Sequence, residues 1–324
     1  MERSPHDADG GTWALSDGRA GNARQALALA SALDTAASEQ ALAPRLPWRW
    51  AAPRRIPGAE AAFGEGFAAL LARPPALAIG CGRQAALATR LLRERGARAV
   101  QVLDPRIAAS HWDLVVVPGH DRLRGDNVVT LLGSLNPVDD AWLEGARTQF
   151  PAPGISAGGP RTVLLVGGPT AQAPWDRREL SAWLDAIDAI LAREGGTLMV
   201  SASRRTPARY RALLRVRCKA RAATCWLDER DGANPYAGLL AWADRIVCTP
   251  DSVNMVSEAA ATRAPVFVAD PGIARGRLRL FLEALSARGR IHALDGEMEA
   301  FQVEPLRETA RVAAEVRARL TPGR

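Results

Sequence analysis

The chain has 324 residues, which at roughly 150 residues per domain is enough for two domains. Apolar residues make up 48% and charged residues 24%, a composition that excludes a disordered chain and a membrane-embedded class. The net charge is +7, but the cations are scattered and no known nucleic-acid-binding motif is present, so we expect no nucleic acid among the partners.

The first half alternates short apolar runs with Ala- and Leu-rich stretches, which is typical of βα units around a parallel sheet. Residues 1–11 are polar and are expected to form a loose tail. The proline-rich stretch 44–57 is expected to form a short strand with loops. Strands are predicted at 13–16, 76–80, 98–103, 113–117 and 127–132, and helices at 22–33, 59–73 and 83–95.

A Pro- and Gly-rich linker at 151–160 separates the second half, which repeats the same alternation. Strands are predicted at 162–166, 197–202, 223–227, 245–248 and 265–269, and helices at 176–194, 207–217, 235–243, 253–262 and 277–288. The pattern predicts an α/β protein with two Rossmann-like, doubly wound domains, at 12–150 and 161–303, facing a cleft. A C-terminal helix is expected within 304–324.

Two further observations favour a cytoplasmic protein. No apolar run reaches 18 residues, and the start of the chain lacks the apolar segment of a secretory signal. The four cysteines form no CxxC pair, which favours reduced, packed thiols.

Glycines and charged residues follow the predicted strands of the first domain, beginning with Asp17 and Arg19 at a helix start that favours anions. Each of them alone is better explained as a capping Asp or a satisfied polar residue. Parallel strands, however, bring their carboxyl ends to one edge of a sheet, where these residues converge. His120 is a candidate general base there. Two acids and one His on separate loops are weak evidence for a metal, and none is expected. The edge comprises Asp17, Gly18, Arg19, Asn22, Arg83, Asp104, Arg106, His120 and Asp121.

The strand ends of the second domain carry residues suited to phosphate. Gly167 and Gly168 let backbone N–H groups approach a phosphate closely. Residues 203–206 combine hydroxyls with two guanidiniums, although an Arg pair is often only a solvated face. This anion site is expected to comprise Gly167, Gly168, Ser203, Arg204, Arg205 and Thr206.

Residues 244–266 predict a strand, a polar turn and a helix. Asp251 and Ser252 are expected to cap this helix, whose N-terminus near Asn254 would face phosphate. Glu258, about two turns into the helix, can accept two hydrogen bonds from a ribose diol, as acids do in dinucleotide folds. The alternative is that Glu258 is a surface acid.

These motifs together resemble the mitochondrial fission elongated-mitochondria family, in the same order over about residues 12–300. The family comprises a plant organelle-division protein and many bacterial proteins. The stretch 243–268 is also similar to the donor segment of GT-B glycosyltransferases, in which the acid matching Glu258 holds the ribose and the loop matching Gly167 and Gly168 faces the diphosphate. The motifs are DGRAGN at 17–22, CGR at 81–83, DPR at 104–106, PGHD at 118–121, VGGP at 166–169, SRRTP at 203–207 and TPDSVNMVSEA at 249–259.

The resemblance implies a metal-independent glycosyltransferase that uses a nucleotide-diphosphate sugar as substrate and needs no further cofactor. The acceptor would bind the first domain, with His120 or Asp17 as the base. A nucleotide-sugar epimerase and a non-catalytic recruitment protein at a membrane surface are the alternatives. Trp48, Arg49 and Trp50 would suit anionic lipid headgroups, unless both Trp side chains alternate inward on a strand and the Arg side chains are merely solvated.

Overall fold

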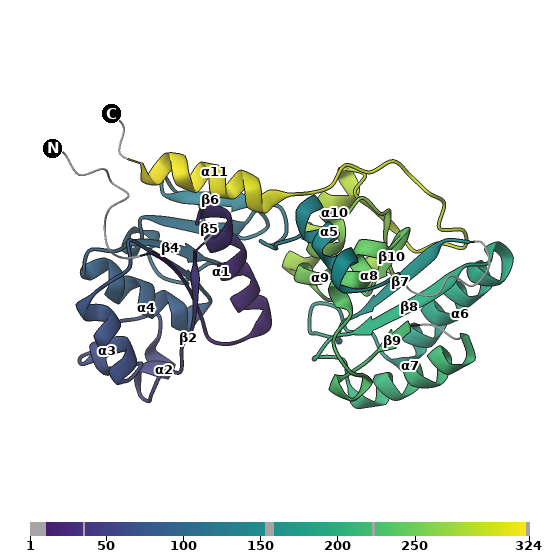
Figure 1. Cartoon of the computed structure of the whole chain (residues 1–324), viewed down its shortest axis with the longest axis horizontal. Coiled ribbons are helices and arrows are strands. Elements are labelled where there is room, and N and C mark those ends of the chain that lie inside the picture. Colours follow the sequence, from purple (N-terminus) through teal and green to yellow (C-terminus); the bar gives the residue numbers. More distant parts are fainter. Residues whose placement is uncertain (1–10, 35, 153–158, 222–223, 322–324) are drawn as a thin grey trace. The chain divides into compact units, whose positions relative to one another are not determined.

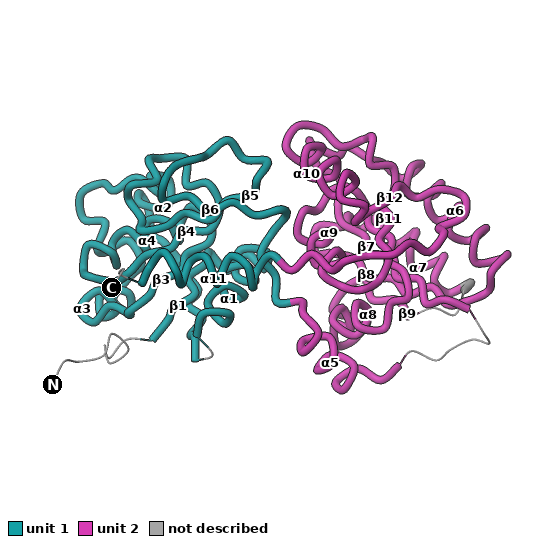
Figure 2. Tube along the Cα trace, turned by 90° about the horizontal axis from the view of Figure 1, so that it is seen from above, with its two compact units in different colours: residues 1–137, 308–324 teal, residues 138–307 magenta. Residues whose placement is uncertain are grey.

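The computed structural model describes residues 11–34, 36–152, 159–221 and 224–321, and side chains at 220–221 are not described. The chain forms two compact units, which are coloured separately in Figure 2. Unit 1 comprises residues 1–137 and 308–324, and unit 2 comprises residues 138–307. Residues 1–10 of the predicted tail (1–11) and residues 153–158 of the predicted linker (151–160) lie outside the described residues.

Unit 1 is built on a six-stranded parallel sheet with the strand order β2-β1-β3-β4-β5-β6 (Figure 1). The strands are β1 (Thr12–Ser16), β2 (Ser38–Ala41), β3 (Leu77–Cys81), β4 (Arg98–Val102), β5 (Leu114–Pro118) and β6 (Val128–Leu131). The helices are α1 (Ala20–Leu33), α2 (Trp48–Ala51), α3 (Glu65–Ala72), α4 (Arg83–Glu94) and α11 (Glu308–Leu320), with short 3-10 turns at Ala59–Ala61 and Ala109–His111.

Helices cover both faces of this sheet. Neighbouring residues of a strand point to opposite faces, and both faces here carry apolar side chains that must be buried. Ala14 belongs to the core cluster that contains α1 and α11, whereas the next residue, Leu15, packs with α3 and α4. The last helix of the chain therefore completes the core of the first unit, and Figure 1 shows it beside α1.

Unit 2 repeats the plan with the strand order β12-β11-β10-β7-β8-β9, again all parallel. The strands are β7 (Arg161–Val166), β8 (Thr197–Ala202), β9 (Thr224–Trp226), β10 (Arg245–Cys248), β11 (Val266–Val268) and β12 (Ile291–Ala293). The helices are α5 (Asp140–Gln149), α6 (Arg177–Glu194), α7 (Ala208–Arg221), α8 (Tyr236–Trp242), α9 (Val253–Ala260) and α10 (Gly276–Ala287), with 3-10 turns at Glu229–Asp231 and Pro271–Ile273.

The predicted α/β class with two Rossmann-like sheets is confirmed, but the units divide at Pro137 and Val138 instead of within 151–160. The reason is α5, which the sequence pattern did not predict and which packs on α8. Trp242 Nε1 donates to the carbonyl of Phe150 (2.9 Å), and a Cβ at Gly238 would meet Phe150 Cβ at 2.5 Å. These contacts keep residues 140–150 with unit 2.

The stretch 44–57 does not form the predicted strand. The strand in this region is β2, at 38–41, and the later residues form the short helix α2. Trp48 packs against the apolar core below α2, and its Nε1 donates to the carbonyl of Pro57 (3.1 Å). A helical turn places Trp50 on another side of the backbone from Trp48, so the two indoles do not both point inward.

Across the described part of the chain, no helix combines the length and the apolar character that crossing a bilayer requires.

The packing of α11 predicts that Val312→Ala destabilises unit 1. Val312 is 0% exposed and lies in the core shared by α11, α1 and the sheet. Losing two methyl groups there should lower the free energy of unfolding by about 1–3 kcal/mol. Urea unfolding measures the loss, and hydrogen exchange followed by mass spectrometry assigns it to unit 1. Val216→Ala, at a position in α7 that is 68% exposed, is the matched control and should change stability by less than about 0.5 kcal/mol.

Candidate functional site

Each sheet has one switch point, where the strand order reverses. It lies between β1 and β3 in unit 1 and between β7 and β10 in unit 2. Ligands of open α/β sheets bind outside the carboxyl ends of the strands at such points. The predicted residues of each unit do follow the carboxyl ends of its strands, so the structure brings each set to one edge of its own sheet.

The switch point of unit 2 is organised by the buried carboxylate of Asp251, whose side chain is 0% exposed. One oxygen, Oδ1, accepts from Trp175 Nε1 (3.0 Å) and Thr249 Oγ1 (2.7 Å). The other, Oδ2, accepts from the Gly168 N–H (2.9 Å) and Arg205 Nη2 (3.1 Å). Four donors from the connections after β7, β8 and β10 therefore converge on one acid, and their hydrogen bonds offset the cost of burying its charge.

The hydrogen-bonded group around Asp251 is called the clamp below and comprises Gly168, Trp175, Arg205, Thr249 and Asp251. The loop after β7, which carries Gly167 and Gly168, donates backbone hydrogen bonds to it. The Gly167 N–H donates to Thr249 Oγ1 (2.8 Å), as the Gly168 N–H does to Asp251. A Cβ at Gly167 would lie 2.0 Å from Asp251 Oδ2, and one at Gly168 would lie 2.3 Å from the carbonyl oxygen of Arg205. The sequence analysis assigned these N–H groups to phosphate; the structure shows that they are used within the protein.

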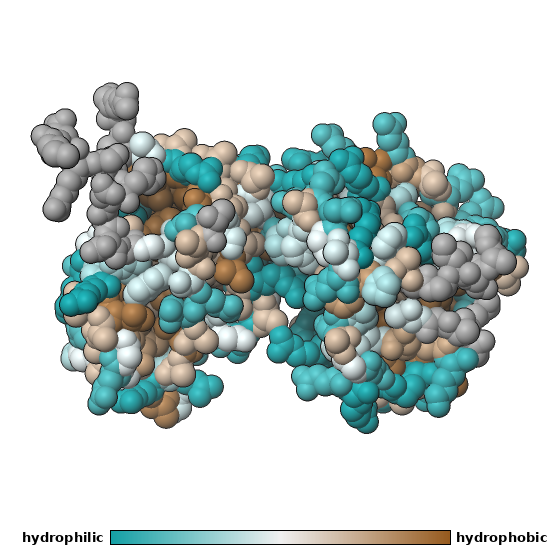
Figure 3. Space-filling model, viewed as in Figure 1, coloured by the Kyte–Doolittle hydropathy of each residue, from teal (hydrophilic) through white to brown (hydrophobic). Residues whose placement is uncertain are grey.

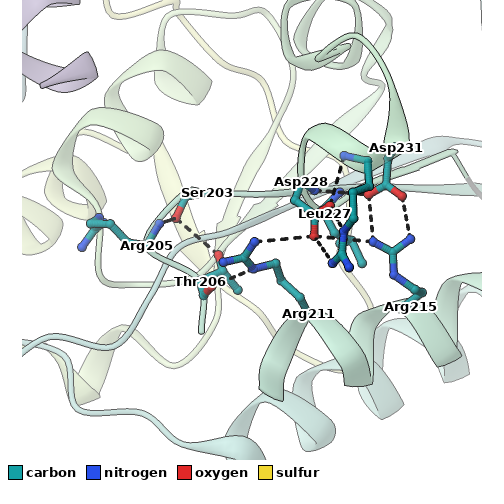
Figure 4. A network of polar contacts seen from close by, with 9 residues as sticks. Ser203, Arg205, Thr206, Arg211, Arg215, Leu227, Asp228 and Asp231 are labelled. Atoms are coloured by element: carbon teal, nitrogen blue, oxygen red, sulfur yellow. Dashed lines mark hydrogen bonds and ion pairs between the residues drawn. The ribbon is translucent and has the colours of Figure 1, made fainter. Parts of the chain in front are cut away.

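The loop after β8 is held by its own hydroxyls (Figure 4). Thr206 Oγ1 donates to the carbonyl oxygens of Val166 (3.0 Å) and Gly167 (2.5 Å) and lies 3.3 Å from Ser203 Oγ. Ser203 Oγ accepts from the Arg205 N–H (3.1 Å). Thr206 is fully buried, so it supports the loop, whereas Ser203 is half-buried.

A charged network extends from this loop to the end of β9. Arg211 Nε donates to the Thr206 carbonyl (2.9 Å), and its Nη1 lies 3.5 Å from Asp228 Oδ2. Arg215 forms a paired contact with Asp231 (2.6 and 3.1 Å), which lowers the pKa of Asp231 to about 2. The sequence analysis did not single out this network, which anchors the loop that carries Arg204 and Arg205.

The two arginines of the loop differ in their contacts. Arg205 reaches Asp251 through Nη2 while half of its side chain stays in solvent. Arg204 is exposed and has no hydrogen bond or ion pair with any described residue. The loop therefore presents the uncompensated guanidinium of Arg204 and the partly neutralised guanidinium of Arg205. Exposed guanidiniums of this kind can bind an anionic ligand.

Helix α9 begins beside the clamp. Ser252 is its N-cap and accepts from the Met255 N–H (3.4 Å), whereas Asp251, expected as a second cap, turns to the glycine loop instead. Val253 and Asn254 in the first turn are half-buried. The N-terminal N–H groups of a helix carry partial positive charge, so this turn can face an anion.

The far end of α9 is fixed by Arg290, which the sequence analysis did not identify. Its buried guanidinium donates to the carbonyls of Ala260 (2.8 Å), Thr262 (2.9 Å) and Ala264 (3.1 Å). Burial lowers the pKa of Arg290 to about 10. A cation at the carbonyl end of a helix is also favourable for the helix dipole.

Glu258 is not the surface acid of the alternative interpretation, because it is 2% exposed. The hydroxyl of Tyr236, at the start of α8, donates to Glu258 Oε2. Tyr236 lies 22 residues away along the chain, and sequence reasoning missed it because no local pattern links the two positions.

In unit 1, Asn22 contacts both Asp17 in the turn after β1 and the start of the loop after β3. Asp17 Oδ1 accepts from the Arg19 N–H (3.2 Å) and Asn22 Nδ2 (3.0 Å), and Arg19 Nε lies 3.5 Å from Asp17 Oδ2. A Cβ at Gly82 would lie 2.6 Å from Asn22 Nδ2. Gly18 has φ +73°, a conformation that favours glycine, so the turn that aims Asp17 depends on this residue.

Among the remaining predicted residues of unit 1, Asp104 and Arg106 contact each other within one loop, whereas Arg83 contacts α2. Asp104 accepts from the Arg106 N–H (2.8 Å) and lies 3.3 Å from Arg106 Nη1, while Arg83 Nη2 donates to the Arg49 carbonyl (3.3 Å). His120 is half-buried and Asp121 is buried. Their loop is tied by Arg124, which the sequence analysis did not single out and which donates to the carbonyls of Gly119, Asp121 and Leu123.

All four cysteines are free thiols, and burial raises the pKa of Cys81 and Cys248 above the usual range. Within residues 11–34, 36–152, 159–221 and 224–321, no three His, Cys, Asp or Glu side chains form a group that would hold a metal ion.

A cavity of about 520 Å³ in unit 2 lies away from the switch point. Its lining includes Pro160, Asp244, Arg245 and Pro265, which precede or begin β7, β10 and β11. The cavity is therefore at the amino ends of these strands, opposite to the edge where ligands of such sheets bind.

Two parallel α/β sheets, one in each unit, give the chain a GT-B type of fold. A solved structure with this fold, the UDP-GlcNAc 2-epimerase of Methanocaldococcus jannaschii, matches with a TM-score of 0.50 and 11% identity, covering 95% of this chain and 99% of the epimerase. This identity is low, so the match shows the fold alone.

The family follows from the sequence. The chain belongs to the family described as Mitochondrial fission ELM1, whose model matches residues 20–320. It is 27% identical over 276 residues to Mitochondrial fission protein ELM1 of Arabidopsis thaliana, and this match covers 76% of the chain but only 64% of the plant protein. It is 24% identical over 346 residues to the uncharacterized protein RP120 of Rickettsia prowazekii, covering 93% of this chain and 96% of that one.

The clamp predicts that Asp251→Asn destabilises unit 2. The amide replaces one acceptor oxygen with a donor, so a buried N–H or guanidinium loses its partner, at a cost of about 1–3 kcal/mol. Urea unfolding measures this loss. Asp126→Asn makes the same chemical change at an exposed side chain of unit 1 and should be neutral within about 0.5 kcal/mol. Equal stability of Asp251→Asn and Asp126→Asn would contradict the role given to the clamp.

Proposed function

We propose that unit 2 binds a nucleotide-diphosphate sugar at the carboxyl edge of its sheet. The observation that carries this proposal is the convergence of an uncompensated Arg204, the half-exposed Arg205 and the first turn of α9 around the β7–β10 switch point. Cationic side chains and a helix N-terminus are the groups that bind diphosphates without a metal. The name of the Methanocaldococcus epimerase, which shares the fold, states a nucleotide sugar.

The contacts divide the predicted nucleotide residues into two groups. The groups left for the diphosphate are the guanidiniums of Arg204 and Arg205, the Ser203 hydroxyl and the first turn of α9 at Asn254. The other group holds these residues in place and comprises Gly167, Gly168, Thr206, Asp251 and Ser252.

Glu258 is proposed to accept the ribose hydroxyls. A carboxylate can accept several hydrogen bonds at once, and the Tyr236 hydroxyl donates to Oε2 of this one. The Tyr236 contact fixes the orientation of the carboxylate before a ligand arrives, which reduces the conformational entropy lost on binding.

The reaction that we favour is transfer of the sugar to a hydroxyl acceptor bound by unit 1. Arg204 and Arg205 would stabilise the negative charge that develops on the departing diphosphate, and no metal is needed for this. Asp17 or His120 would remove the acceptor proton, with Arg19, Asn22 and Arg83 on the same edge of the unit 1 sheet.

Two alternatives remain beside transfer. Epimerisation of the nucleotide sugar would use the same donor site in unit 2. Recruitment of other proteins without catalysis is the second candidate, because the plant relative carries the name of a mitochondrial fission protein. The exposed indole of Trp50, which is 73% accessible, favours a surface function of this kind.

The donor site predicts that a nucleoside diphosphate raises the melting temperature of the wild-type protein. At about 100 times its dissociation constant, a ligand adds roughly 2.7 kcal/mol of stability. A thermal-shift screen of UDP, GDP, ADP, CMP and their sugar conjugates measures this response. Arg204→Ala, a change at an exposed position, should weaken binding about tenfold or more because a charge-assisted contact to phosphate is lost.

The control for this screen is Arg178→Ala, which removes another exposed arginine near the start of a helix and should bind as the wild type does. Glu258→Gln should also weaken binding, with a smaller effect on a nucleotide that lacks the ribose 2′-hydroxyl. Absence of any shift in the wild type would contradict the donor site and place recruitment first.

Turnover separates the two enzymatic candidates. Transfer predicts that nucleoside diphosphate is released from the stabilising nucleotide sugar only when an acceptor is added from a panel of sugar and lipid-linked alcohols. Epimerisation predicts a change of sugar configuration with no acceptor present, which proton NMR detects. Asp17→Asn should slow transfer at least a hundredfold if Asp17 is the base, while leaving the thermal shift with the donor unchanged.

A further inference from the structure

The segment around α2 carries an unusual concentration of exposed apolar surface. Leu46 is 56% exposed and Trp50 is 73% exposed. Among the described residues, four large hydrophobic side chains are more than half exposed, and two of these four lie within residues 46–50. Figure 3 shows brown atoms at the lower edge of unit 1, where Figure 1 draws α2.

Hydrogen bonds to neighbouring elements hold this segment in place. Beyond the Trp48 contact with the Pro57 carbonyl (3.1 Å), the Arg45 N–H donates to the Ala62 carbonyl (2.7 Å). From α4, Arg90 Nη1 donates to the Pro53 carbonyl (2.7 Å) and Arg83 Nη2 to the Arg49 carbonyl (3.3 Å). Because Trp48 is anchored in the core, the indole of Trp50 is held in solvent by the fold.

The apolar groups are surrounded by cations. Arg45, Arg49 and Arg54 are exposed, and none of them pairs with a carboxylate of the described residues. The adjacent Arg55, by contrast, is neutralised by Glu60 (2.6 Å) and Glu94 (3.0 Å). The surface is therefore positive as well as apolar.

We propose that this surface, which we call the α2 surface (Arg45, Leu46, Arg49, Trp50 and Arg54), docks unit 1 on an anionic lipid bilayer. An indole favours the boundary between headgroups and acyl chains, and guanidiniums favour the negative potential above it. Two apolar side chains are too few for the buried core of a stable protein–protein interface. Two apolar side chains are enough for reversible attachment to a bilayer when neighbouring cations contribute electrostatic attraction to anionic lipids. Trp48, grouped with this surface in the sequence analysis, is an anchor of α2 instead.

The docking proposal does not depend on nucleotide binding, because the α2 surface shares no residue with the site in unit 2. Flotation of the full chain with vesicles tests it. One vesicle type is phosphatidylcholine alone, and the other contains phosphatidylcholine with about one third phosphatidylglycerol. We expect the wild type to float only with the anionic vesicles, and to do so less as salt shortens the range of the attraction.

Two variants separate the apolar from the electrostatic contribution. Trp50→Ala should reduce the bound fraction at every salt concentration. The triple variant Arg45→Ala/Arg49→Ala/Arg54→Ala should reduce the partition coefficient at least tenfold and remove most of its salt dependence. All these side chains are exposed, so unchanged melting temperatures are expected and confirm that the variants fold.

The matched controls change the same residue types elsewhere. The triple variant Arg178→Ala/Arg275→Ala/Arg288→Ala removes three exposed arginines of unit 2, and Val216→Ala removes an exposed apolar side chain. Both should float as the wild type does. Equal loss of flotation in the two triple variants would assign binding to net charge and overturn the proposal.

Two further results would also overturn it: no flotation of the wild type, or flotation that neither α2 variant reduces. A wild-type dimer in sedimentation that Trp50→Ala abolishes, without flotation, would instead make the α2 surface a contact between two copies of this chain.

Discussion

The carboxylate of Asp251 is the interaction on which the candidate site of unit 2 depends. A buried charge is tolerated only where hydrogen bonds compensate it, and here donors from the ends of β7, β8 and β10 and from Trp175 all meet it. The acid thus joins loops that would otherwise be independent, at the point where the strand order reverses. Arg205 and the first turn of α9 take their positions from this junction.

The clamp changes the role of the glycine motif. A Gly-Gly pair after a strand suggests N–H groups that face phosphate, but both N–H groups here serve Thr249 and Asp251. Both glycines are needed because the protein packs against their α-carbons more closely than a Cβ allows. Phosphate recognition, if unit 2 binds a diphosphate as proposed, therefore rests on side chains and on the N-terminus of α9.

The fold was predictable because strands buried on both faces are continuous apolar runs, and the predicted strand at 245–248 matches β10 residue for residue. Because the strands of each sheet are parallel, the motifs that follow strand ends lie at the carboxyl edge of their own sheet. Contacts distant in sequence were not predictable: Tyr236 with Glu258, Phe150 with α8, and the preference of Asp251 for the glycine loop over the helix cap. In the stretch 44–57, alternating Trp and Arg suggested a strand, but anchoring of Trp48 in the core produced a helical turn.

The two switch points carry an aspartate each, and their surroundings give the two acids different capacities. Asp251 receives four hydrogen bonds and no solvent, so its acceptor positions are filled. Asp17 accepts from Arg19 and Asn22 within its own turn, and part of its side chain reaches solvent. An acid that must take a proton from a substrate needs an accessible lone pair as well as a fixed position. Gly18 and Asn22 hold Asp17 in place, and its Oδ2 lies 3.5 Å from the exposed guanidinium of Arg19. For this reason we propose chemistry at unit 1 and assign Asp251 of unit 2 to anchoring.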